Sequence, residues 1–168
     1  MQLQSLVTKA RQSKRGMAFL NWAMQREIPF NKPHRFRILE ISENRVQVAI
    51  PYRKSNLNHI KGLHACAMAT ACEYASGLLL LTKLGEKNYR LIMESMHMAY
   101  HYQGKTDAVA TFEISDERLQ KEALEPLQSV EKVVLPCEIL LHDAQGNHLC
   151  TGTTHWQLKR WDKVKTKL

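Results

Sequence analysis

The sequence predicts an α+β fold in which one long, buried helix is wrapped by a single antiparallel sheet. Residues 64–84 indicate a helix built largely of small apolar side chains, and a helix that is apolar on every side is usually buried. Two segments that alternate apolar and polar residues precede this helix, and four strand-like segments follow it. One helix enclosed by one sheet satisfies this order economically.

An additional N-terminal helix is predicted over residues 1–27. Leu3, Leu6, Val7 and Ala10 give it an apolar face, and its first 26 residues contain five cationic side chains and no acid. This composition faintly resembles an organellar presequence. An amphipathic helix that packs its apolar face and exposes its basic face is the simpler interpretation.

The predicted strands form a pair before the long helix and a group of four after it. Their ranges are residues 34–41, 45–52, 89–103, 106–114, 132–142 and 148–161. The long helix ends near Gly85, since glycine is common just after a helix C-terminus. Ser115 and the two acids after it start a charged helical connector that runs to Pro126.

Length and composition predict one domain over residues 1–168. The chain is 44% hydrophobic and 24% charged, which is ordinary for a globular protein that buries a sizeable core. No internal repeat or low-complexity linker divides it. We therefore expect the N-terminal helix (1–27) and a core (34–161) to belong to one unit.

Cysteine usage and charge bound the compartment and the partners. The four cysteines have no CxxC spacing, which favours reduced core residues and a cytoplasmic location. The net charge of +8 favours an anionic partner. The basic residues are dispersed without an aromatic–basic motif, so nucleic acid is not the expected partner. The eight histidines show no metal-ligand spacing, and we expect neither a metal nor a resident cofactor.

One carboxylate, Glu73, lies near the middle of the long apolar helix. Its position argues against a membrane-spanning role for that helix, and we expect no membrane partner. An unpartnered carboxylate in such surroundings would cost several kcal/mol, against total stabilities of roughly 5–15 kcal/mol. Glu73 therefore needs either a structural partner, such as a core tyrosine or serine, or a chemical function.

The segment around Glu73 resembles a known motif. The spacing Asn58-x5-His64-x8-Glu73, with Gly62 in the approach to the helix, is similar to the motif of hotdog-fold acyl-CoA thioesterases of the phenylacetyl-CoA type. In that family the histidine is followed by two glycines, and an acid lies nine residues after it. Here the glycine pair is replaced by Ala65 and a cysteine.

The motif covers residues 58–73, and the fold-level resemblance covers residues 34–161. The resemblance implies the hotdog fold, hydrolysis of an acyl-CoA thioester as substrate, and paired sites in a homodimer or homotetramer. It leaves open whether the carrier is coenzyme A or an acyl carrier protein.

The chemistry of these residue types agrees with thioester hydrolysis. Glu73, with a pKa raised by desolvation, is the candidate general base or nucleophile. The backbone N–H of Ala65, at the positive end of the helix, is the candidate oxyanion donor. Asn58 is expected to position water or substrate, although it could instead shape the loop. His64 is expected to orient the helix start rather than to react.

Helix geometry predicts that the site needs a second chain. Nine residues place Glu73 about 13.5 Å along the axis from His64 and on the opposite face. One helix cannot bring both ends to one substrate carbon. A two-fold dimer that sets the helix start of one chain beside Glu73 of the other solves this problem.

Two alternatives remain open from the sequence. His59 and Glu73 are spaced as in hotdog hydroxyacyl dehydratases, but the proline-rich segment of those enzymes is missing, because no proline lies between Pro51 and Pro126. The loss of the glycine pair instead favours a non-catalytic acyl-CoA-binding module.

Overall fold

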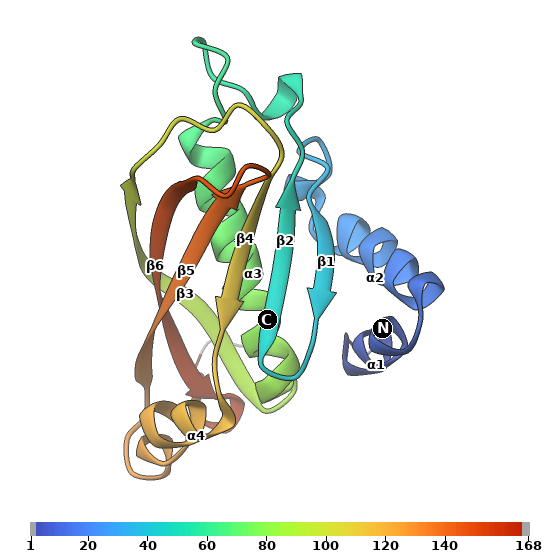
Figure 1. The fold of residues 1–168 in the computed structure, drawn as a ribbon. Helices are drawn as coiled ribbons and strands as arrows, with labels where there is room; N and C mark the ends of the chain where they lie inside the picture. Colours follow the sequence, from blue (N-terminus) through green and yellow to red (C-terminus); the bar gives the residue numbers. More distant parts are fainter. Residues whose placement is uncertain (1–2, 166–168) are drawn as a thin grey trace.

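A six-stranded antiparallel sheet packs against one long helix, α3, in the computed structural model, which describes residues 3–165 (Figure 1). The sheet order is β1-β2-β4-β5-β6-β3. The helices are α1 (Leu3–Gln12), α2 (Lys14–Glu27), α3 (Ala65–Leu84) and α4 (Asp116–Leu119). The strands are β1 (Arg37–Ile41), β2 (Arg45–Ile50), β3 (Tyr89–Tyr100), β4 (Ala108–Glu113), β5 (Val133–Asp143) and β6 (His148–Arg160). The predicted α+β hotdog architecture is confirmed.

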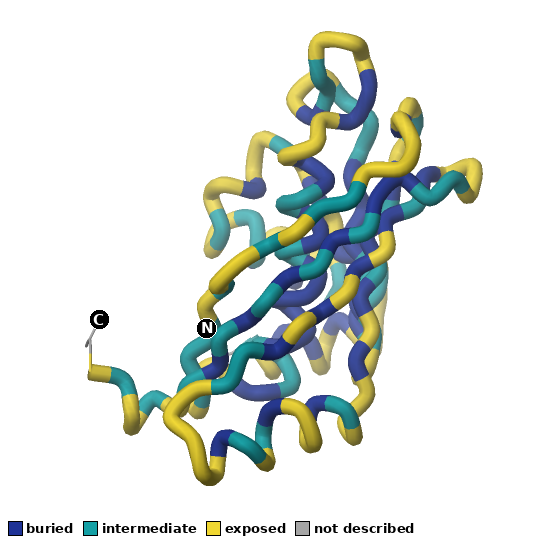
Figure 2. Tube along the Cα trace, turned by 90° about the vertical axis from the view of Figure 1, so that its left-hand side faces the viewer, coloured by how far each residue is buried: buried dark blue, intermediate teal, exposed yellow. Residues whose placement is uncertain are grey.

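The core lies between the inner face of the sheet and α3. The register pairs Val48 with Ala110 and Ala110 with Leu141, so that apolar side chains from three strands share one face. Each of these three side chains is fully buried, and buried positions alternate with exposed ones along the strands (Figure 2). The period-two pattern of the sequence thus fixes which face of the sheet is covered.

Small side chains let α3 approach the sheet closely. A Cβ atom on Gly77 would lie 3.0 Å from the Trp156 ring, so the indole packs directly on the helix backbone. The Trp156 Nε1–H donates to Ser76 Oγ at 3.0 Å, and Ser76 Oγ also lies 3.1 Å from Thr154 Oγ1. α3 is long and apolar enough to cross a membrane by length and composition, but 61% of its apolar window is buried within the protein. It is the core helix of this fold.

The N-terminal region is helical, as predicted, but it divides into two helices at Ser13. The Ser13 backbone is extended, and its Oγ accepts the Gly16 N–H at 3.0 Å, which caps α2. A Cβ atom on Gly16 would lie 2.0 Å from Lys9 O, so only glycine allows this close turn. Residues 1 and 2 of the predicted helix lie outside the described residues.

The two edges of the sheet differ. At β1, the Asn21 side chain of α2 accepts the Ile38 N–H at 2.7 Å and donates to Ile38 O at 3.0 Å, as a neighbouring strand would. At the other edge, β3 pairs with β6 and with no other described strand. β3 therefore presents an open row of backbone groups, which is the kind of edge that pairs with another chain.

The charged connector is helical, as predicted. Ser115 Oγ accepts the Arg118 N–H at 3.1 Å and caps α4, which continues as a π-helical turn, η3 (Gln120–Leu124). The connector lies at the end of the sheet away from the start of α3 (Figure 1).

Replacing Ser76 by alanine should lower the free energy of unfolding by about 1–3 kcal/mol, because the buried Trp156 N–H would lose its acceptor. Urea denaturation measures this change. Thr82→Ala is the matched control, because among residues 3–165 the Thr82 hydroxyl bonds only the Leu78 carbonyl of its own helix, and its change should stay within about 0.5 kcal/mol. Equal stability of the Ser76 variant and wild type would contradict the role of this bond.

Candidate functional site

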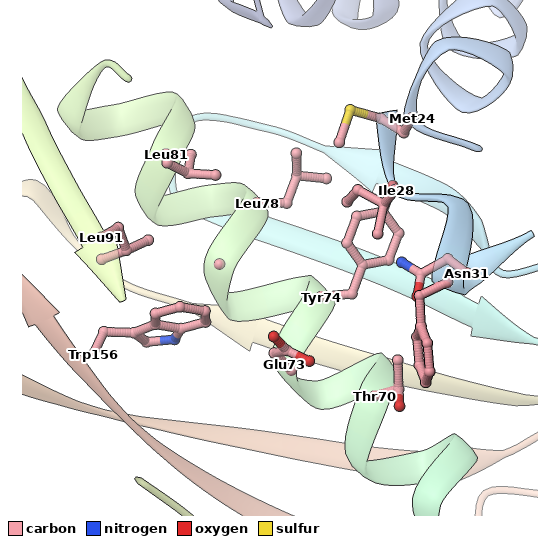
Figure 3. A pocket seen from close by; sticks show the side chains of 12 residues that line it. Met24, Ile28, Asn31, Thr70, Glu73, Tyr74, Leu78, Leu81, Leu91 and Trp156 are labelled. Carbon is pink, nitrogen blue, oxygen red and sulfur yellow. The ribbon is translucent and has the colours of Figure 1, made fainter. Parts of the chain in front are cut away.

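Glu73 opens onto a pocket of about 440 Å³ between α3 and the N-terminal region (Figure 3). This volume falls within the ~300–1,000 Å³ usual for small-molecule sites. One helix face lines its floor, and α2 and the 3-10 turn η1 (Pro29–Asn31) form the opposite wall. The lining residues are Met24, Ile28, Phe30, Asn31, Thr70, Glu73, Tyr74, Gly77, Leu78, Leu81, Leu91 and Trp156.

The Glu73 carboxylate has no hydrogen-bond or ion-pair partner among residues 3–165. The nearby Ser76 hydroxyl bonds the backbone carbonyl of Glu73, at 3.1 Å, and not its carboxylate. Burial raises the pKa of Glu73 above its usual value, because desolvation penalises the charged form. The structural role expected as an alternative, a bond to a core tyrosine or serine, is therefore not seen, and the carboxylate remains available to a bound molecule.

Asn31 is a pocket residue that sequence reasoning missed. It follows Pro29 and Phe30 in a segment that reads as a loop, and an asparagine there predicts only a turn. The structure buries it to 6% exposure at the pocket wall, across from Thr70 and Tyr74 (Figure 3). No sequence signal distinguishes this asparagine from an ordinary loop residue.

The start of α3 lines a second hollow, of about 350 Å³, together with residues of the loop after β3. Ala65 is exposed there at the first helical position, where a backbone N–H has no partner within the helix. His64 caps the helix through its Nδ1, which accepts the Cys66 N–H at 3.0 Å. His64 is therefore the N-cap residue of α3.

The Asn58 side chain is engaged within its own loop. Its Oδ1 accepts the Ile60 N–H at 3.1 Å and the Gly62 N–H at 2.9 Å. Asn58 therefore shapes the loop that leads into α3, which is the structural role that the sequence left open beside a role in positioning water or substrate. It also lines the hollow at the helix start, so its amide nitrogen remains near any ligand bound there.

Within one chain, the predicted site residues are not brought together. Glu73 lies in the first pocket, whereas Asn58 and Ala65 line the second hollow. The eight residues from Ala65 to Glu73 span about 12 Å of helix. His59 is exposed on the loop and lines neither of these hollows. A single chain thus holds Glu73 and the start of α3 in two separate hollows.

Residues 16–158 match the family described as "Domain of unknown function (DUF4442)". The chain belongs to this family. A comparison with curated protein sequences finds no match.

Solved structures of the same fold include three that span most of this chain. A Pseudomonas aeruginosa protein described as a probable thioesterase is 22% identical to this chain, with a TM-score of 0.77. The superposition covers 83% of this chain and 93% of the P. aeruginosa chain. A Staphylococcus aureus thioesterase variant is 14% identical, with a TM-score of 0.63, and the superposition covers 78% of this chain and 98% of the S. aureus chain. A variant of another P. aeruginosa thioesterase is 10% identical, with a TM-score of 0.66, and the superposition covers 83% of this chain and 91% of the P. aeruginosa chain. At these identities the likeness establishes the hotdog fold.

Replacing Glu73 by glutamine should stabilise the protein above about pH 4.3, the pKa of an unfolded glutamate. In the folded protein the pKa of Glu73 is raised, so as pH rises the unfolded chain loses this proton first. The wild-type free energy of unfolding therefore falls between the unfolded pKa and the folded pKa of Glu73, and it stays lower at higher pH. The Gln variant lacks this titration. Urea denaturation from pH 3 to pH 8 measures the difference between the two proteins, which should vanish at the acid end.

Glu86→Gln, at an exposed position just after α3, is the control and should change stability by less than about 0.5 kcal/mol at every pH. A Glu73 variant that tracks wild type throughout this range would contradict the desolvation of this carboxylate.

Proposed function

We propose that this protein is an acyl-CoA thioesterase in which Glu73 acts as the general base or the nucleophile. The observation that carries the proposal is an unpartnered carboxylate, with a raised pKa, on the wall of an apolar pocket in a hotdog fold. A base whose pKa is shifted upward is better matched to proton transfer near neutral pH than an ordinary glutamate.

The reaction that this site would perform is hydrolysis of a thioester. In the general-base route, Glu73 accepts a proton from water while the water oxygen attacks the thioester carbonyl carbon. The negative charge that develops on the carbonyl oxygen is stabilised by the Ala65 N–H at the positive end of a helix. The tetrahedral intermediate then collapses, the C–S bond breaks, and the proton held by Glu73 passes to the sulfur, which leaves as a thiol.

A spacing in a structural relative supports this assignment. The S. aureus thioesterase was crystallised with alanine in place of a glutamine and, separately, in place of a glutamate fifteen residues later. Asn58 and Glu73 are also fifteen residues apart (73 − 58). An amide residue and a glutamate therefore occur at the same separation in both chains.

The proposed active unit is a two-fold dimer, because the two half-sites lie in different hollows of one chain. The open edge of β3 offers a surface on which a second copy can pair, whereas Asn21 covers the β1 edge. In such a dimer Ala65 of one chain would serve the Glu73 pocket of the other.

Coenzyme A is the proposed carrier. Its phosphates suit a protein of net charge +8, and Lys61 and Lys105 lie on the loops that border the hollow at the helix start. Both side chains are exposed and thus accessible to a phosphate.

A non-catalytic acyl-CoA-binding module is the second candidate. The engagement of Asn58 Oδ1 within its loop favours it, because that oxygen is not free to hold a water. The two candidates agree on the ligand and differ in whether the bound thioester is cleaved.

Glu73→Gln decides between these functions. If Glu73 is catalytic, turnover of an acyl-CoA should fall at least ~10²-fold, the low end for loss of a positioned acid–base group, while acyl-CoA binding survives. Thiol release measures turnover, and calorimetry measures binding. Unaltered hydrolysis in the folded variant would end the catalytic assignment, and absence of hydrolysis in wild type would favour the binding module.

Ala65→Pro tests the oxyanion donor and the dimer together. Proline is tolerated at the first helical position, and the preceding His64 already has the extended backbone that proline requires (φ −70, ψ 136). The substitution removes only the N–H, so the melting temperature should change little while turnover falls ~10²–10³-fold.

Co-refolding Ala65→Pro with Glu73→Gln should then restore activity to about a quarter of wild type, because half of the dimers are mixed and each has one complete site. Mixtures that stay as inactive as the separate variants would contradict a site shared between chains.

A further inference from the structure

We propose that the N-terminal segment of residues 24–31 selects the substrate, by limiting the length of a straight-chain fatty acyl group and by binding its polar end through Asn31. This inference rests on the proposed function and assigns its substrate class. It follows from the shape of the Glu73 pocket, from the distribution of polar groups along it, and from an amide that faces the pocket and has no partner among the described residues.

The pocket is elongated along α3. Its helical lining residues recur with a three- and four-residue spacing from Thr70 to Leu81 and occupy one face of the helix. Eleven residues of helix correspond to a length of about 16 Å. A groove of this length along one helix face suits an extended chain better than a compact ring.

Polar and apolar groups are separated along this groove. Thr70, Glu73 and Asn31 lie toward one end, and Leu81 and Leu91 lie toward the other (Figure 3). A thioester held beside Glu73 would therefore extend its alkyl chain toward Leu81, away from the start of the helix.

The wall that faces α3 comes from outside the sheet and the central helix. Met24 and Ile28 extend from α2 and its C-terminal end toward Leu78 (Figure 3). Phe30 also lines the pocket and is 67% exposed. Side-chain size at Met24 and Ile28 thus sets the width of the groove from outside the sheet and the central helix.

Asn31 points to a ligand. Its side chain is 6% exposed and faces the pocket, yet its amide has no hydrogen-bond partner among the described residues. The amide nitrogen and oxygen of Asn31 are reached by water through the pocket, so a bound molecule can take the place of the water that hydrates them. Asn56, by contrast, is fully buried and its amide bonds His34 O, Pro51 O and the His34 ring. An oxygen of the bound thioester, or a water beside it, would pair the Asn31 amide.

Asn31→Leu compared with Asn56→Leu tests the amide. If Asn31 binds ligand, Asn31→Leu should leave the melting temperature of the ligand-free protein little changed, because the Asn31 amide makes no hydrogen bond to another described residue, and should weaken binding of decanoyl-CoA between about two- and ten-fold. Asn56→Leu should lower the melting temperature. A melting temperature lowered by Asn31→Leu, with ligand affinity unchanged, would assign Asn31 a structural role and overturn this part of the proposal.

A panel of acyl-CoA thioesters from acetyl to palmitoyl tests the groove. Affinity in the Glu73→Gln background should rise up to about four-fold for each added methylene until the groove is filled. Met24→Trp places a larger side chain in the wall and narrows the groove. The ratio of kcat/KM for long-chain substrates to kcat/KM for short-chain substrates should therefore fall by about ten-fold. Phe19→Trp is the matched control, because Phe19 lies on the same helix, is 45% exposed and does not line the pocket; it should leave the ratio unchanged.

The outcomes separate this proposal from the proposed function. Hydrolysis that is indifferent to chain length and to Met24→Trp overturns the acyl assignment and leaves the thioesterase standing. Chain-length-dependent binding that Met24→Trp weakens, without any hydrolysis by wild type, supports the groove and overturns catalysis. Absence of both binding and hydrolysis overturns both.

Discussion

The close packing of α3 against the sheet is the constraint on which the rest of this structure depends. The helix can be enclosed only because its side chains are small where β6 crosses it, as at Gly77, which meets the ring of Trp156. The indole N–H must then find an acceptor in the core, and Ser76 supplies it. The same packing that buries the helix turns Glu73 toward the N-terminal region, where a pocket remains.

That pocket exists because the N-terminal helices cover only part of the exposed face of α3. α2 is held at the β1 edge by the two bonds of the Asn21 side chain, and the chain then turns at η1 before it enters β1. The arrangement closes one edge of the sheet and leaves β3 open. α2 therefore blocks the β1 edge from pairing with a strand of another chain, and it also builds the wall of the candidate site.

Two groups in the pocket are held in states that do not favour stability. Glu73 is a carboxylate with a pKa raised by desolvation, and the Asn31 amide faces the pocket without a hydrogen-bond partner among residues 3–165. Unpaired polar groups of this kind are common where a protein must bind or transform a ligand, because the ligand supplies the missing partner. Asn56 and Ser76, away from this pocket, are buried polar residues whose side chains are hydrogen-bonded within the protein.

The sequence by itself determined where the strands and the central helix lie, and that the Glu73 carboxylate lies within an apolar helix. Period-two alternation placed the six strands, with ends that differ by a few residues where loops such as 101–104 turn to meet the start of α3, and Gly85 marked the end of the helix. The break at Ser13 was not predicted, because a serine within an amphipathic pattern does not by itself end a helix.

Only the tertiary structure decided which polar groups share a pocket. Asn58, singled out by its spacing, bonds its own loop, whereas Asn31, which carried no signal, faces Glu73's pocket. The physical reason is that local patterns report burial and backbone conformation along one element. The meeting of α2, η1 and α3 depends on how distant segments pack, and no periodicity within any one of them encodes it.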